Sequence, residues 1–210
     1  MSDSSPRNDG QRILGVVLAG GKSTRMGRCK SDLQHPGGGT YLERAVERMR
    51  SVCDEVAVSL AGESDHPPDA SRPGDLPAGA HRVFDSQTDR GPAEGVARSL
   101  DLAMSLRCTA VLLTPVDVPH LQAAHLNMLI SQFAAEPVKI VCAISDDLSA
   151  TKPLQPLIAV YPVQTYPDIM RLAQSERRGL YRFIQNSEHG TVALPADALH
   201  NVNSPHDLPS

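Results

Sequence analysis

A glycine-rich segment followed by basic side chains is the part of this chain best suited to bind phosphate groups. The apolar run 16–18 leads directly into Gly20 and Gly21. Basic residues come next, among them Lys22, Arg25 and Lys30. Glycines let backbone N–H groups approach a ligand closely, and neighbouring cations neutralise negative charge. A tight turn with solvated basic residues would explain the glycines but not the cations. The segment therefore predicts binding of a nucleoside triphosphate.

Two common phosphate-binding loops do not match this segment. A Walker A loop needs a glycine, four further residues and then Gly-Lys-Ser or Gly-Lys-Thr. Val16 stands where that first glycine should be. The Rossmann pattern Gly-x-Gly-x-x-Gly fails as well, because Lys22 stands where its second glycine should be. A P-loop kinase is therefore disfavoured, and the phosphate loop is predicted to run from Ala19 to Lys30.

Two carboxylates follow predicted strands. Asp117 comes shortly after the apolar run 110–114, between two prolines. A carboxylate at a strand end is well placed to hold Mg²⁺, although by itself Asp117 would equally suit capping of the next helix. Asp85 follows the short strand 81–84 and precedes a Gly-Pro-x-x-Gly segment at 91–95. It could accept hydrogen bonds from a base or ribose, or serve only the turn.

Length and composition predict one cytoplasmic domain. The 210 residues fit a single domain at 12–210, with 1–11 as a disordered polar leader. A formal net charge of −4 with mixed signs predicts no general affinity for nucleic acid or membranes. The four cysteines form no CxxC pair and the eight histidines no HxxxH spacing, which disfavours zinc and disulfides. With no signal peptide or membrane-spanning run, the reducing cytoplasm is the expected location.

The hydrophobic pattern predicts alternating strands and helices. Strands are expected at 13–18, 55–60, 81–84, 110–114, 138–143, 157–161 and 191–194. Helices are expected at 40–50, 91–106, 122–134, 164–174 and 178–185, with a long loop at 62–79. This order is typical of an α/β fold with a mostly parallel sheet. In such sheets ligands bind beyond the carboxyl ends of the strands. The positions expected there are 19–30, Ser59, Asp85 and Asp117.

Taken in order, these motifs resemble the molybdenum cofactor guanylyltransferase family (MobA-like). The resemblance covers about residues 13–208 and rests on Leu18-Ala19-Gly20-Gly21-x-Ser23-x-Arg25-Met26-Gly27-x-x-Lys30, on Asp85 with Gly91-Pro92-x-x-Gly95, on Pro115-x-Asp117-x-Pro119, and on Asn201-x-Asn203-Ser204-Pro205-x-Asp207-Leu208. It implies a Rossmann-like three-layer sandwich of the nucleotidyltransferase type. It also implies transfer of GMP from GTP to molybdopterin, with Mg²⁺ as cofactor, to give molybdopterin guanine dinucleotide and pyrophosphate.

The resemblance also implies roles for individual residues. The catalytic residues would be Arg25, Lys30 and Asp117, with Asp117 as the metal ligand. The nucleotide would be bound by Leu18, Ala19, Gly20, Gly21, Lys30, Ser59, Asp85 and Asp117. The pterin substrate would face Asn201 and Asn203. Protein partners would be other proteins of molybdenum cofactor biosynthesis or molybdoenzyme chaperones.

The chain departs from the family pattern at two positions, and two other functions stay open. Cys29 stands where the family usually has Asp, which removes a charge beside Lys30. Ser59, a shorter donor, stands where the family commonly has Asn. One alternative is a cytidylyltransferase acting on molybdopterin or another phosphorylated small molecule. The other is a non-catalytic nucleotide-binding module in cofactor insertion, which would have no use for a metal carboxylate aimed at phosphates.

Overall fold

The computed structural model describes residues 10–19, 34–35, 38–60, 76–84, 91–147, 149–176 and 179–202. The expected leader lies outside these residues up to position 9, as does the expected loop 62–79 up to position 75. Within the described residues, no helix combines the length and apolar character needed to span a bilayer.

One mixed sheet organises the part of the chain that is described. Its strands are β1 (Ile13–Leu18), β2 (Glu55–Leu60), β3 (His81–Phe84), β4 (Ala110–Pro115), β5 (Ile140–Ser145), β6 (Leu154–Pro162) and β7 (His189–Leu194). Their spatial order is β3-β2-β1-β4-β6-β5-β7. β6 is antiparallel to both of its neighbours, and all other neighbouring pairs are parallel. This confirms the predicted α/β fold with a mostly parallel sheet.

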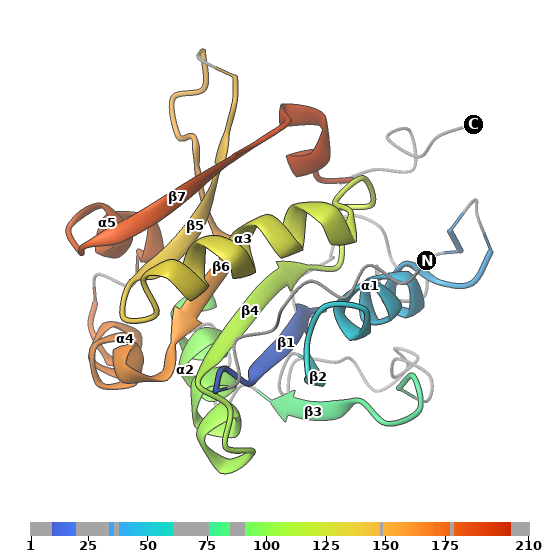
Figure 1. Cartoon of the computed structure of the whole chain (residues 1–210), viewed down its shortest axis with the longest axis horizontal. Coiled ribbons are helices and arrows are strands. Elements are labelled where there is room, and N and C mark those ends of the chain that lie inside the picture. Colours follow the sequence, from blue (N-terminus) through green and yellow to red (C-terminus); the bar gives the residue numbers. More distant parts are fainter. Residues whose placement is uncertain are drawn as a thin grey trace.

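Helices cover both faces of the sheet (Figure 1). They are α1 (Tyr41–Arg50), α2 (Pro92–Ser105), α3 (Ala123–Ala135), α4 (Tyr166–Gln174) and α5 (Leu180–Gln185), with short 3-10 helices at Val163–Thr165 and Ala196–Leu199. Buried side chains of α1 and α3 belong to one core cluster, and those of α2, α4 and α5 belong to the other. The layers are therefore helix, sheet and helix, as the resemblance implied.

The apolar sequence of β1 follows from burial on both sides. Ile13 and Val17 pack in the cluster of α1, whereas Leu14 and Val16 pack in the cluster of α2. Each of these four side chains is at most 4 % exposed. A strand with both faces covered has no position for a polar side chain, so its sequence is continuously hydrophobic.

Gly15 lets β1 and α1 pack closely, and its replacement gives a stability prediction. A Cβ on Gly15 would lie 2.9 Å from Cys53 Sγ and 3.2 Å from Met49 Sδ. We expect Gly15→Ala to lower the free energy of unfolding by about 1–3 kcal/mol, because buried neighbours must shift to admit the methyl group. Urea unfolding measures this loss. Gly179→Ala is the matched control, since nothing lies within 4 Å of its Cβ. Equal stability of the two variants would contradict the prediction.

The structure extends β6 beyond the predicted strand 157–161, because this strand tolerates a proline. Pro156 has no N–H to donate, and the β5–β6 register shifts beside it. Tyr161 Oη donates a hydrogen bond of 2.7 Å to the Pro156 carbonyl, which replaces part of the lost pairing. Prolines occur in strands at such irregularities. The sequence prediction began the strand after the proline and so made it too short.

The three cysteines among the described residues lie in the core. Cys53, Cys108 and Cys142 are buried free thiols. Burial raises the pKa of Cys142 to about 12, so this thiol stays uncharged at neutral pH. These side chains act as small hydrophobic residues of the core.

Candidate functional site

Three parallel strands place their carboxyl ends side by side. Leu18 of β1 is in register with Ser59 of β2 and with Pro115 of β4. One residue further on, Ala19 N donates to Ser59 O at 2.9 Å, and Val116 N donates to Leu18 O at 3.1 Å. These backbone bonds fix the start of the glycine-rich segment relative to the residues that precede Asp117. The edge so formed is where an α/β sheet binds its ligand.

The C-terminal segment is held against the same edge. Val202 N donates to Asp117 O at 2.9 Å, and the Val202 side chain is 4 % exposed. Asn201, directly before it, is exposed. The structure therefore places Asn201 next to a residue that is bonded to Asp117, although the two lie far apart in the sequence.

The backbone around Asp117 is rigidly anchored while the residue itself stays partly accessible. Val116 is 6 % exposed and Val118 is fully buried. Leu121 N donates to Val118 O at 3.3 Å and closes a turn before α3 begins. This geometry holds the carboxylate at the edge of the sheet without burying it.

The chemistry of Asp117 fits a hard divalent cation that is completed by substrate. Among the described residues there is no group of three or more His, Cys, Asp and Glu side chains that could hold a metal alone. Mg²⁺ is commonly bound by one or two carboxylates together with substrate phosphates and water. A single partly exposed carboxylate at the strand ends is compatible with that requirement.

Ser59 is the penultimate residue of β2 and is only 4 % exposed. Its carbonyl already accepts the hydrogen bond from Ala19. Ser59 and Leu18 thus lie in register at this edge, but Ser59 offers less accessible surface than the sequence suggested.

Several predicted site residues lie outside the described part of the chain. They are Gly20, Gly21, Arg25, Lys30, Asp85 and Asn203. The described residues that flank them lie at the edge already defined: Ala19 at the end of β1, and Phe84 in register with Leu60 at the end of β3. The roles of the six residues stay predictions.

The Gly-Pro segment begins α2 at this edge, and it contains a carboxylate that the sequence analysis did not single out. Gly91 has φ 73°, which favours glycine, and Pro92 occupies the first helical turn as expected. Glu94 in that turn is 6 % exposed, with Arg98 Nε 3.8 Å from its Oε1. An acidic side chain in the first turn interacts favourably with the helix dipole. No periodic pattern in the sequence distinguishes this glutamate from a solvated one.

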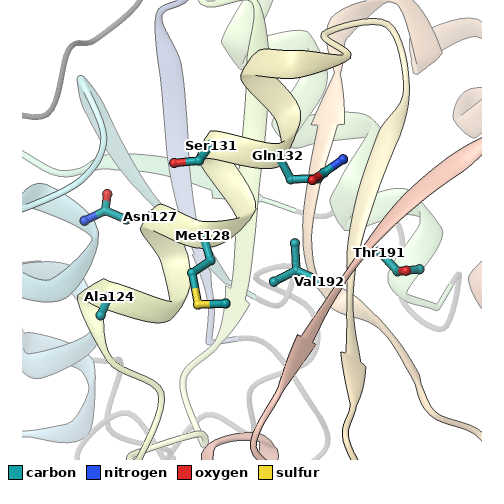
Figure 2. A pocket seen from close by; sticks show the side chains of 7 residues that line it. All are labelled: Ala124, Asn127, Met128, Ser131, Gln132, Thr191 and Val192. Carbon is teal, nitrogen blue, oxygen red and sulfur yellow. The ribbon is translucent and has the colours of Figure 1, made fainter.

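A surface groove of about 540 Å³ lies elsewhere, between α3 and β7 (Figure 2). It is lined by Ala124, Asn127, Met128, Ser131, Gln132, Thr191 and Val192. None of the described site residues lines it, so the groove is separate from the edge that carries Asp117.

Comparison with known proteins identifies relatives over nearly the whole chain. The family model described as the MobA-like NTP transferase domain matches residues 15–192. A probable molybdenum cofactor guanylyltransferase of Rhodopirellula baltica is 44% identical over 197 residues, which are 93% of this chain and 90% of that protein. The molybdenum cofactor guanylyltransferase of Rhodopseudomonas palustris is 32% identical, over 92% of this chain and 87% of the relative.

Solved structures share the fold. Rv0371c from Mycobacterium tuberculosis H37Rv matches with a TM-score of 0.68 and 21% identity, over 94% of this chain and 95% of that one. A structure of Rv0371c in complex with manganese matches with a TM-score of 0.61, over 89% of each chain. At this identity the likeness supports the arrangement of strands and helices.

Proposed function

The chain belongs to the MobA-like NTP transferase family, and we propose from this that it transfers GMP from GTP to molybdopterin and releases pyrophosphate. The observation that carries the proposal is the chain of backbone hydrogen bonds that joins Ser59, Ala19, Leu18, Val116, Asp117 and Val202 at one sheet edge. It supports a shared site, because it joins the backbones of Leu18, Ala19, Ser59 and Asp117, four of the residues expected to bind nucleotide or metal. Both core clusters share a single sheet, which supports one domain over residues 12–210.

The proposed reaction needs positioning and charge neutralisation rather than a covalent nucleophile. A terminal phosphate oxygen of molybdopterin forms a new bond to the α-phosphorus of GTP. The bond from the α-phosphorus to the bridging oxygen breaks, and its electron pair leaves with pyrophosphate. Two anionic groups must approach each other, so fixed positive charge at the site lowers the barrier.

Within this proposal Asp117 holds Mg²⁺, and Arg25 and Lys30 hold the triphosphate. When bound, Mg²⁺ neutralises phosphate charge and orients phosphate oxygens. The rigid backbone between Val116 and Leu121 supports Asp117, because a carboxylate on an anchored turn keeps its position when the ligand binds.

Within this proposal the end of β1 would contact the base through carbonyl oxygens. The Ala19 N–H already donates a hydrogen bond to Ser59 O, so it is not available to a ligand. Carbonyl oxygens of this segment keep a free lone pair, and guanine offers N1–H and N2–H donors to such acceptors. Cytosine offers an amino group as well, so the choice of base needs a direct measurement.

Pyrophosphate release with different nucleotides tests the proposed function. We expect release to require molybdopterin and Mg²⁺, and to be at least about tenfold faster with GTP than with CTP, ATP or UTP. Preference for CTP would contradict the proposal and show that the enzyme transfers CMP. Binding of GTP without any pyrophosphate release would favour the non-catalytic nucleotide-binding module.

A further inference from the structure

One face of α1 carries two arginines that reach two different loops. Arg44 and Arg48 are four residues apart, so they lie on the same side of the helix. Arg44 Nε donates to Gly38 O at 3.0 Å. Arg48 Nη1 donates to Leu121 O at 2.6 Å, although the two residues are 73 positions apart. This helix face therefore spans from the turn before α1 to the loop that follows Asp117.

Each of these loops contributes a histidine. His35 lies in a tight turn in which His35 N donates to Gly39 O at 2.7 Å and Gly38 N donates to His35 O at 2.9 Å. Its ring lies edge-on to Tyr41, with ring centroids 5.0 Å apart. His120 is exposed and directly precedes Leu121, the residue that Arg48 holds. We call His35, Arg44, Arg48 and His120 the basic cluster.

The members of the basic cluster act on each other electrostatically. The pKa of His35 is lowered, first by burial and then by the positive charges of Arg44, Arg48 and His120. Burial also lowers the pKa of Arg48 to about 10, which leaves it charged at neutral pH. The groups that face His35 are thus Arg44, Arg48 and Tyr41 from α1 and His120 from the loop before α3.

Two carboxylates of this helix turn lie near the cluster and have contacts of their own. Glu43 is occupied in the capping box of α1, where its Oε2 accepts from Thr40 N. Glu47 Oε2 lies 3.7 Å from Arg44 Nη1 in an exposed ion pair. Such a pair contributes little interaction energy because water screens it. The arginines carry positive charge and the histidines can acquire it, so an anionic ligand would interact favourably with the cluster.

The position of the basic cluster points to the reacting phosphates. His120 lies three residues after Asp117, and α1 follows the glycine-rich segment in the chain. Resting on the proposed function, we propose that the basic cluster binds a phosphate group of the reaction, either the terminal phosphate of the acceptor or the departing pyrophosphate. Guanidinium and imidazolium N–H groups suit phosphate oxygens. Arg44, His35 and His120 would contact the ligand, whereas Arg48 adds charge and holds the His120 loop.

Titration with simple anions tests the proposal without nucleotide or pterin. Histidine NMR signals of the wild-type protein are followed while orthophosphate, and separately pyrophosphate, is added. We expect the signals of His35 and His120 to move with at least one of the two anions and the pKa of His35 to rise, since a bound anion stabilises the imidazolium. Affinity for the anion should then fall as the pH rises through the pKa of His35 in the complex.

Two variants and a control identify the binding groups. His120→Gln and Arg44→Gln should each weaken anion binding by about tenfold, the loss of one charge-assisted contact. Arg171→Gln removes an exposed arginine from α4, on the other face of the sheet, and should bind like the wild type. Unmoved histidine signals, or equal affinity in all three variants, would overturn the proposal.

Kinetics distinguish the two sources of phosphate. A raised KM for molybdopterin in His120→Gln, with an unchanged KM for GTP, assigns the cluster to the acceptor. Weaker product inhibition by pyrophosphate, with an unchanged KM for molybdopterin, assigns it to the leaving group. Anion binding in a protein without transferase activity would count against the proposed function but would still support anion binding by the basic cluster.

Discussion

Asp117→Asn is expected to reduce kcat for GMP transfer by on the order of a hundredfold or more while the fold stays intact. The substitution keeps the size of the side chain and removes its charge. The backbone contact also survives, because Val202 donates to the Asp117 carbonyl and not to its side chain. The loss should therefore come from weaker metal binding and poorer charge neutralisation.

The measurement is pyrophosphate release as a function of Mg²⁺ concentration, with thermal unfolding as a check on the fold. Asp101→Asn is the matched control, because Asp101 is an exposed carboxylate on α2. We expect Asp117→Asn to need much more Mg²⁺ for half-maximal activity and Asp101→Asn to behave like the wild type. A wild-type rate and metal requirement in Asp117→Asn would remove the metal role from this residue.

Three strands could be predicted with their exact bounds from the pattern of apolar residues. β1, β2 and β3 begin and end where the sequence predicts. Both faces of β1 are covered, so its run of apolar residues is uninterrupted up to the glycines. Where burial changes, the prediction was less accurate: Val138, expected at the start of a strand, is 70 % exposed and precedes β5.

The position of Asp117 beyond the end of a buried strand could be predicted, because a strand end is visible in the sequence. The tertiary contacts that hold Asp117 in place could not be predicted. Val202 and Asp117 meet through backbone atoms, which carry no sequence signal. Arg48 looks like any solvated arginine on an amphipathic helix until the fold brings Leu121 to it. Tertiary contacts of this kind decide which polar residues belong to a site.

The directions of the strands explain why the predicted site residues follow the same ends of several strands. β1, β2, β3 and β4 run parallel, so their carboxyl ends and the segments that follow them meet at one edge. The strand β6 runs the opposite way and carries no predicted site residue at that edge. The direction of the strands, more than their number, determines which loops can contact the same ligand.

Lys30→Ala is expected to lower kcat/KM for GTP by about a hundredfold or more. A cation placed where negative charge develops on the phosphates stabilises the transition state by several kcal/mol. Lys30 lies outside the described residues, so the reason comes from the sequence. It follows the glycine-rich segment in the sequence. Lys30→Arg should recover only part of the activity, because a planar guanidinium does not reproduce the compact charge of an ammonium group.

Lys139→Ala provides the control for this loss. Lys139 precedes β5 at the opposite end of the strands from Asp117, and its Nζ pairs with Glu136 on the surface. Removing that exposed pair should change the stability little and leave kcat/KM unchanged. If the rate of pyrophosphate release fell equally in Lys30→Ala and Lys139→Ala, net charge alone would explain the effect. A loss confined to Lys30→Ala requires a local contact with the triphosphate, because both variants change the net charge of the protein by the same amount.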